Sequence, residues 1–187
     1  MPRQSKPARQ REQLWLPPGH NFSKAVLDAS PLFTMLTVSY VRKYGRDPLL
    51  HKAHLGIETD IQDGYLWLLS RIRAVFSTSH VVGELQGLQN SRLRLRGPDL
   101  ENFWLHTVDL LMMKNFDEEL IRLLDMGQRV PSRIGIGRVG PTDMGLIELA
   151  LREGCVLFTD DEATLAPLAL QHGVDCRLVR PMAESFR

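Results

Sequence analysis

The chain has 187 residues, which is enough for one domain with a sizeable core. Hydrophobic residues make up 43% of it and charged residues 24%, a composition that excludes disordered and fibrous proteins. The formal net charge of +1 excludes a uniformly basic nucleic-acid binder, so a polyanion would have to bind at a local patch.

Residues 1–22 read as a basic, flexible N-terminal extension that precedes one domain over residues 23–187. Four basic side chains precede Pro17-Pro18-Gly19: Arg3, Lys6, Arg9 and Arg11. Such an extension is either a solvated terminus or an arm for nucleic acid or a partner. No apolar segment of membrane-spanning length is present, and two cysteines give no disulfide framework. We therefore expect a cytoplasmic protein that is neither exported nor membrane-spanning.

The first half of the domain alternates strands with helices. The apolar run at residues 25–27 predicts a short strand that stops at Asp28, and a helix follows to about residue 43, before Gly45. A second helix is predicted over residues 60–73, and Val75-Phe76 indicates the next strand. In the helix after that strand, Val81, Glu84, Leu85 and Leu88 fall at i, i+3, i+4 and i+7, so we expect Glu84 among core-facing side chains.

A group of histidines and acids separates the first two helices. His51 and His54 are one turn apart, with Glu58, Asp60 and Asp63 after them. This spacing is either a transition-metal site or a solvated helix surface, and we favour the surface.

The middle of the chain carries a basic alternation, Arg92-Leu93-Arg94-Leu95-Arg96. It predicts either an edge strand with one basic face or the end of the Glu84 helix, stopped by Gly97-Pro98. Helices are predicted next over residues 99–115 and 117–126, with Met112 and Met113 as core filling.

The last third predicts the loop and the strands that complete a sheet. Residues 127–140 hold four glycines, Arg133 and Arg138, and indicate a short strand and a loop at the carboxyl edge of the sheet. A helix over residues 140–151, a strand over 155–158, a helix ending near Gly173 and a strand over 176–179 follow. This alternation predicts an α/β fold with three α/β/α layers around a parallel sheet of four to five strands.

Four acids occupy corresponding places in these units. Asp28 and Asp161 follow strands, whereas Glu84 and Asp143 lie near the starts of helices. Asp143 has Leu146, Ile147 and Ala150 at i+3, i+4 and i+7, which places its carboxylate on an apolar stripe. Because a buried carboxylate is neutralised, paired or bound to a metal, four such acids indicate one shared cation.

These acids are expected to meet where parallel strands end. Carboxylate oxygens suit Mg²⁺ or Mn²⁺, and such a cluster favours phosphodiester hydrolysis by an activated water. Five arginines are candidate phosphate contacts: Arg92, Arg94, Arg96, Arg133 and Arg138. Each acid has a structural alternative, since Asp28 could cap the next helix and Asp143 could interact with a helix dipole.

The same residues carry a family resemblance. Asp28-Ala-Ser30, Glu84-Leu85, Thr142-Asp143 and Thr159-Asp160-Asp161 together resemble the pattern of a PIN domain over residues from about 24 to 180. The resemblance implies a ribonuclease in which Asp28, Glu84, Asp143 and Asp161 bind Mg²⁺ or Mn²⁺. It also implies supporting roles for Ser30, Thr142 and Thr159, and a contact from Asp160 to the metal through water.

The resemblance further implies RNA as substrate, with an antitoxin and a second copy of the chain as candidate partners. The segment between Asp28 and Glu84 and the N-terminal extension are longer than in toxin-type members, which weakens the toxin assignment. An alternative is a non-catalytic PIN-like module that binds RNA or protein. A haloacid-dehalogenase-type phosphohydrolase requires a second Asp where Ser30 stands, and a phospho-receiver requires an acidic pair before the first strand.

Overall fold

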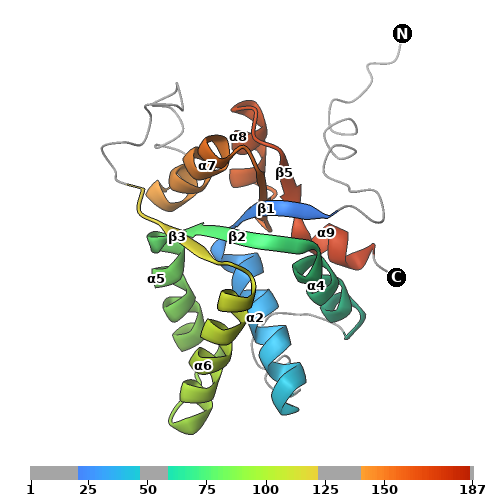
Figure 1. The fold of residues 1–187 in the computed structure, drawn as a ribbon, viewed down its shortest axis with the longest axis vertical. Helices are drawn as coiled ribbons and strands as arrows, with labels where there is room; N and C mark the ends of the chain where they lie inside the picture. Colours follow the sequence, from blue (N-terminus) through green and yellow to red (C-terminus); the bar gives the residue numbers. More distant parts are fainter. Residues whose placement is uncertain (1–20, 47–58, 122–139, 186–187) are drawn as a thin grey trace.

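The computed structural model describes residues 21–46, 59–121 and 140–185 (Figure 1). Within these ranges five strands form one parallel sheet in the order β3-β2-β1-β4-β5. The strands are β1 (Phe22–Leu27), β2 (Ile72–Thr78), β3 (Asp117–Glu119), β4 (Val156–Thr159) and β5 (Cys176–Leu178). The predicted α/β class with a central parallel sheet is confirmed.

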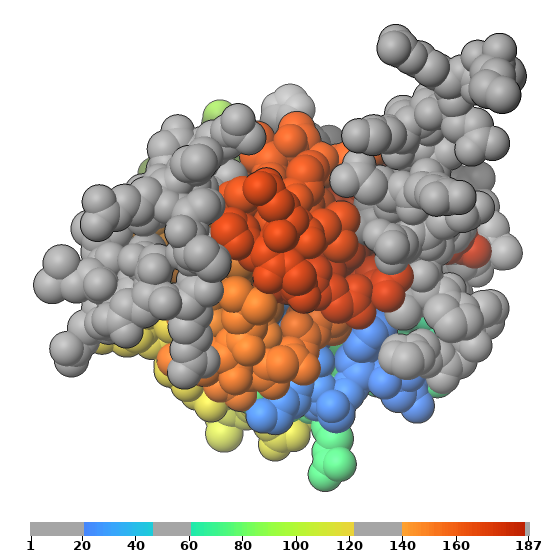
Figure 2. All heavy atoms as spheres, turned by 90° about the horizontal axis from the view of Figure 1, so that it is seen from above, coloured from blue at the N-terminus to red at the C-terminus, as the bar shows by residue number. Residues whose placement is uncertain are grey.

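Helices cover both faces of the sheet and complete three layers. The helices of the described residues are α2 (Ala29–Tyr44), α4 (Thr59–Arg71), α5 (Ser79–Leu88), the π-helical turn η1 (Gln89–Leu93), α6 (Pro98–Met113), α7 (Pro141–Glu153), α8 (Leu165–Gln171) and α9 (Val179–Glu184). Figure 1 shows α2, α5 and α6 on one side of β1 and β2, and α7 and α8 on the other. In Figure 2, viewed from that other side, the atoms from α7 onward cover the centre of the face.

The centre of the sheet is apolar because its strands are covered on both faces. Ala25, Val26 and Leu27 of β1 have no exposed surface, and β4 is buried along its whole length. Parallel strands covered by helices read as continuous apolar runs, which is why the sequence predicted β1 and β4. The strand termini are therefore fixed by a rigid core.

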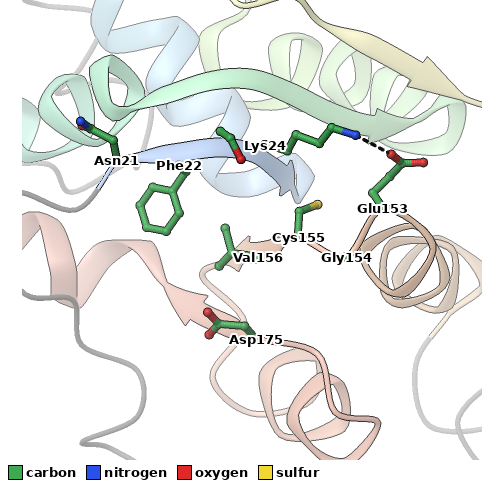
Figure 3. Close-up of a pocket in the computed structure, with 9 residues that line it drawn as sticks. Asn21, Phe22, Lys24, Glu153, Gly154, Cys155, Val156 and Asp175 are labelled. Atoms are coloured by element: carbon green, nitrogen blue, oxygen red, sulfur yellow. Dashed lines mark hydrogen bonds and ion pairs between the residues drawn. The ribbon is translucent and has the colours of Figure 1, made fainter.

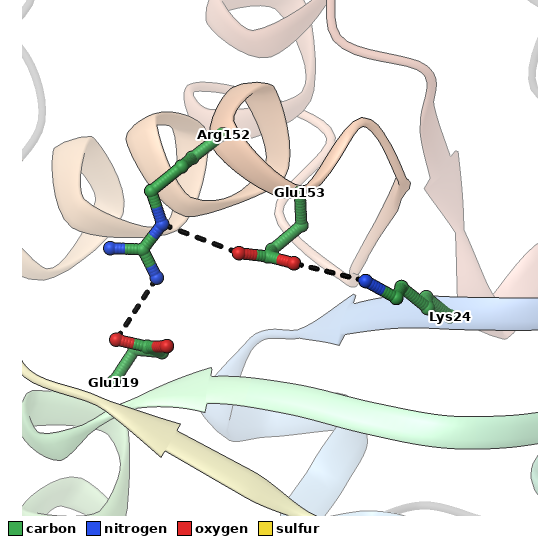
Figure 4. Close-up of polar contacts among 4 residues, drawn as sticks. All are labelled: Lys24, Glu119, Arg152 and Glu153. Atoms are coloured by element: carbon green, nitrogen blue, oxygen red, sulfur yellow. Dashed lines mark hydrogen bonds and ion pairs between the residues drawn. The ribbon is translucent and has the colours of Figure 1, made fainter.

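A chain of ion pairs fixes the carboxyl-terminal end of α7 to the sheet (Figure 4). Lys24 Nζ of β1 lies 3.1 Å from Glu153 Oε2, and Arg152 Nε lies 3.3 Å from Glu153 Oε1. The Arg152 guanidinium also lies 3.0 Å from Glu119 Oε2 of β3. Partly exposed pairs of this kind contribute modestly, about 0–1 kcal/mol each. Their role is to connect α7 with two strands of the sheet.

Three expectations from the sequence are corrected by the structure. Residues 117–119 form β3 rather than the start of a helix, because they pair with Phe76, Ser77 and Thr78 of β2 and this pairing overrides local helix propensity. Met112 and Met113 face solvent and do not fill the core. Glu84 is exposed, because α5 buries Val81 and Leu85 and leaves Glu84 beside this stripe.

The basic alternation at residues 92–96 ends the helix that carries Glu84, which is the second of the two structures predicted for it. Residues 89–93 continue α5 as η1, and Arg94 ends the turn in the left-handed conformation with φ 54°. Pro98 begins α6 instead of only stopping the preceding helix. The expectations for residues 1–20, for His51, His54 and Glu58, and for the loop with Arg133 and Arg138 lie outside the described residues.

The close approach of α4 and α9 requires a glycine at residue 64 of α4. A Cβ atom added to Gly64 would lie 2.4 Å from the Cα atom and the carbonyl oxygen of Ala183. Backbone atoms of α9 cannot move aside as a flexible side chain would. We therefore expect Gly64→Ala to lower the free energy of unfolding by about 1–3 kcal/mol, measured by urea denaturation.

Gly83 is the matched control, because it lies in a helix and a Cβ added there has no atom within 4 Å. Gly83→Ala should raise the free energy of unfolding by about 0.5–1 kcal/mol through helix propensity. Equal effects of the two substitutions would contradict the close approach of α4 and α9.

Candidate active site

The order of the strands reverses between β1 and β4. From β1 the chain adds β2 and β3 on one side, and it then adds β4 and β5 on the other side. Asp28 follows β1, and Asp160 and Asp161 follow β4. In open parallel sheets ligands bind outside the carboxyl ends of the strands at such a switch point. The predicted convergence of Asp28 with the acids after β4 at this edge is therefore a feature of the topology.

Thr159 joins the ends of the two central strands. Its hydroxyl donates a hydrogen bond to Asp28 Oδ2 at 2.7 Å and accepts one from the backbone N–H of Asp161 at 3.0 Å. The N–H of Ala29 donates to Asp28 Oδ1 at 2.6 Å, so Asp28 is also the N-cap of α2. The capping role and the site role thus belong to the same carboxylate, and Thr159, which is fully buried, fixes its orientation.

Burial raises the pKa of Asp28 to about 6. The hydrogen bonds from Thr159 and Ala29 oppose this effect, and the negative charges of Asp143 and Glu84 add to it. An ionised carboxylate loses hydration when it is buried, and nearby like charges cost further energy. Asp28 is therefore held in a destabilised charged form at neutral pH, which is characteristic of functional sites.

Asp143 lies at the same edge of the sheet as Asp28, because its charge acts on that carboxylate. Gly140 caps α7 and Pro141 begins it, so Asp143 stands in the first turn, half-buried. Burial raises its pKa, and the charges of Asp161 and Glu84 raise it further. Although Glu84 is exposed, its charge acts on both Asp28 and Asp143. The four acids predicted from the sequence are therefore linked electrostatically, since Glu84 and Asp143 act on Asp28, and Asp161 acts on Asp143.

Asp161 is occupied by the turn that follows β4. Its Oδ1 accepts hydrogen bonds from the N–H groups of Ala163 at 2.9 Å and Thr164 at 2.8 Å. Its Oδ2 accepts from the Thr164 hydroxyl and from the N–H of Leu165 at 3.2 Å. Burial raises the pKa of Asp161, but these hydrogen bonds outweigh burial and lower it overall. A carboxylate has about four lone-pair positions, so metal coordination by Asp161 would require loss of one of these bonds.

Asp160 connects the end of β4 to α4 and α9. Its Oδ1 accepts from the backbone N–H of Arg180 at 2.9 Å, and its Oδ2 accepts from the Tyr65 hydroxyl at 3.3 Å. Burial raises its pKa, and the charges of Arg180 and Arg92 act in the opposite direction. Tyr65 and Arg180 are not recognisable as site residues from the sequence, because nothing in the sequence places α4 and α9 beside the end of β4.

Basic side chains reach this edge from two elements. Arg92 of η1 and Arg180 of α9 are both close enough to lower the pKa of Asp160. Arg180 also pairs with Glu184 at 3.2 Å, whereas Arg94 Nε bonds to the Ser91 carbonyl at 3.2 Å and Arg96 is exposed. Of the predicted arginines in the described residues, Arg92 is the one whose charge acts on the acids of this edge.

Ser30 and Thr142, the predicted supporting residues, are half-buried in the first turns of α2 and α7.

The carboxylate donors at this edge suit a metal ion, but the spacing of the described side chains does not. Carboxylates are the donors that Mg²⁺ and Mn²⁺ prefer, and Asp28 and Asp143 are acids whose charged forms a cation would stabilise. Within residues 21–46, 59–121 and 140–185, however, no three His, Cys, Asp or Glu side chains are spaced to hold one ion. The acids influence one another electrostatically without forming a ligand shell in this conformation.

A pocket of about 310 Å³ lies at the opposite edge of the sheet (Figure 3). It is lined by the start of β1, by the turn between α7 and β4, and by Asp175 before β5. Burial raises the pKa of the Cys155 thiol in this pocket to about 11, so the thiol is protonated at neutral pH and is a weak nucleophile. Since ligands of parallel sheets bind at the carboxyl ends, this pocket is a less favourable candidate site.

Comparisons of the chain with family models, with curated proteins and with solved structures found no match. Among the helices of the described ranges, none has the length and apolar character needed to cross a bilayer. The interpretation of the site therefore rests on its own residues.

Replacement of Asp28 by Asn should make the folded chain more stable at neutral and alkaline pH. The pKa of Asp28 is about 6 in the folded chain, whereas an unperturbed aspartate has a pKa of 3.8. Ionisation of Asp28 therefore destabilises the fold increasingly as the pH rises from 3.8 to about 6, and fully above that. Asn retains the capping oxygen. Asp28→Asn should therefore raise the free energy of unfolding by about 1–3 kcal/mol near pH 8.

Urea denaturation between pH 4 and 8, with chelator present, measures this difference. The gain should shrink as the pH falls through about 6 and vanish near 3.8. Asp109→Asn is the control, because this acid is exposed on α6. A destabilised Asp28→Asn protein at every pH would show that Asp28 serves only as a cap.

Proposed function

We propose that the chain is a metal-dependent endoribonuclease that hydrolyses phosphodiester bonds. The observation that supports this most strongly is the raised pKa of Asp28 at the strand-order reversal, where Glu84 and Asp143 add negative charge. Asp28 and Asp143 are buried acids whose charged forms are destabilised, and such carboxylates favour a cation and a phosphate ligand. RNA as the substrate rests on the resemblance of the acid pattern to PIN domains.

Asp28, Glu84 and Asp143 are the proposed metal-binding residues. Bound Mg²⁺ or Mn²⁺ would polarise the phosphoryl group and stabilise the leaving oxygen. Asp161 contributes negative charge beside Asp143, while its oxygens organise the turn before α8. Asp160 keeps Tyr65 and the backbone of Arg180 at the end of β4, so we assign it a positioning role.

The chain itself supplies the orientation of Asp28 and positive charge beside Asp160. Thr159 holds Asp28 Oδ2, and the Ala29 N–H holds Oδ1, so the carboxylate cannot rotate away from the edge. Without a metal, a carboxylate with a pKa of about 6 is ionised at neutral pH at an energetic cost that a bound cation would relieve. Arg92 and Arg180 lie beside Asp160, where they can contact phosphates that flank the scissile bond.

A non-catalytic RNA- or protein-binding module is the second candidate function. It is favoured by the four hydrogen bonds that Asp161 already accepts and by the absence of metal-ligand spacing among the described side chains. An antitoxin partner and a homodimer belong to the proposal through the resemblance alone. A cytoplasmic location belongs to it through the presence of only two cysteines in the sequence.

Asp143 provides the test of catalysis. Asp143→Asn should reduce Mg²⁺- or Mn²⁺-dependent cleavage of single-stranded RNA by at least ~100-fold, because it removes one charge from the proposed metal site. Cleavage of an end-labelled RNA, with chelator as the blank, measures this loss. The products should carry a 5′-phosphate and a 3′-hydroxyl.

Asp109→Asn is the matched control, since Asp109 is exposed on α6. Activity that survives in Asp143→Asn would remove Asp143 from the mechanism. A 2′,3′-cyclic phosphate product would indicate a route without metal-activated water.

Arg92 and Arg94 form a pair that tests the phosphate contacts. Arg92→Gln should weaken RNA binding by about tenfold and reduce the salt dependence of binding by about one counterion, because its guanidinium lies at the acid edge. Arg94→Gln should have little effect, since Arg94 bonds to the carbonyl of Ser91 within its own turn. Fluorescence anisotropy at several salt concentrations, with Ca²⁺ to limit cleavage, measures both. Equal effects would contradict the assignment.

A further inference from the structure

The solvent side of α6 carries a stripe of large apolar side chains. Leu105, Val108 and Met112 stand at i, i+3 and i+7 and are 58%, 53% and 74% exposed. Met113 lies beside them and is 69% exposed. Positions with this spacing lie on one face of a helix, so the four side chains form an apolar patch, here called the α6 stripe, into which Asp109 is inserted between Leu105 and Met113.

The stripe is not the core-facing side of α6. The buried residues of the helix are Phe103, His106, Thr107 and Leu110, and they face the rest of the domain. Phe103 contacts Phe33 and Tyr40 of α2, and His106 Nε2 lies 3.0 Å from the Ser39 hydroxyl. A helix that is apolar on both sides is normally buried on both sides. The outward stripe therefore has the character of a contact surface.

Acids share the face of the stripe. Glu101 and Asp109 are exposed four residues before and four residues after Leu105, and Asp117 and Glu118 are exposed in β3. Between residues 98 and 120 the only lysine or arginine is Lys114, whose Nζ donates to the carbonyl oxygen of Ile72 at 3.0 Å. The face of α6 thus combines apolar side chains with the negative charges of Glu101 and Asp109.

We infer that the α6 stripe docks a basic amphipathic helix of a partner protein. The apolar side of such a helix would cover Leu105, Val108 and Met112, and its Lys or Arg side chains would pair with Glu101 and Asp109. Nucleic acid and anionic membranes are unsuitable occupants, because both would be repelled by these acids. A second copy is disfavoured, because it would bring the same acids of two chains together.

This inference does not depend on the proposed nuclease function. In Figure 1, α6 stands on the opposite side of the sheet from α7, the helix that carries Asp143. Substitutions on the stripe should therefore leave the acids at the strand ends unchanged.

A synthetic peptide of leucine and lysine can serve as the probe. It has Leu at i, i+3, i+4 and i+7 over roughly five helical turns, and it carries a fluorophore. A peptide of the same composition in shuffled order and a peptide with Glu in place of Lys are its controls. We expect the full-length protein to bind the probe at least ~10-fold more tightly than either control peptide.

Two variants test the surface itself. Leu105→Ser with Met112→Ser should reduce binding of the probe to the level of the shuffled peptide. Glu101→Gln with Asp109→Asn should weaken binding and lower its salt dependence while the apolar stripe remains. Asp63→Asn, an exposed acid on α4, should change nothing. Circular dichroism checks that each variant is folded.

Three outcomes would overturn the inference. The first is equal binding of the patterned and shuffled peptides. The second is undiminished binding of the probe by the folded serine variant. The third is a concentration-dependent dimer in sedimentation velocity that the serine substitutions abolish, since it would identify a second copy as the occupant.

Discussion

The hydrogen bond from the Thr159 hydroxyl to Asp28 is the contact on which the proposed site depends. It joins the carboxyl ends of β1 and β4, the two strands between which the strand order reverses. Because Thr159 is fully buried and both strands are covered on both faces, Asp28 has little freedom to turn toward water. The sheet therefore holds a carboxylate in surroundings that oppose its charge.

The acids at this edge divide into two environments. Burial raises the pKa values of Asp28, Asp143 and Asp160, whereas hydrogen bonds from the turn before α8 lower the pKa of Asp161. Neighbouring acids whose pKa values are pushed apart can take different chemical roles. In the proposal Asp28 helps to bind a cation, while Asp161 supplies a permanent charge and organises its turn. The buried residues of α7, from Met144 to Ala150, keep this helix against the sheet, and the ion-pair chain from Lys24 to Glu119 adds a connection at its carboxyl-terminal end.

Strongly patterned features of the fold were predictable from the sequence. The apolar runs of β1 and β4, the helix after Asp28 and the helix that begins near Asp143 follow from local periodicity and capping, which do not depend on distant contacts. β3 was missed because its residues, Asp117 to Glu119, have little strand propensity and are ordered by pairing with β2. The exposure of Met112 and Met113 was missed because composition does not reveal which face of a helix meets the core.

The site was predictable in position and less so in detail. Helical spacing placed Glu84 next to apolar neighbours, but a helix stripe has margins, and Glu84 lies on one. The occupation of Asp161 by local N–H groups and the contacts of Asp160 with Tyr65 and Arg180 depend on a turn and on long-range packing that periodicity does not encode. Strand order, which brings Asp28 and Thr159 together, likewise appears only in the folded chain.

The titration of Asp28 tests the central claim most directly. In metal-free protein the carboxyl carbon signal of Asp28, followed by NMR as a function of pH, should show a midpoint near 6. Glu84→Gln should lower this midpoint, because it removes one of the charges that raise it. Added Mg²⁺ should lower the midpoint as well, since a bound cation favours the charged form. A midpoint at or below 3.8 that neither Glu84→Gln nor Mg²⁺ changes would contradict the account.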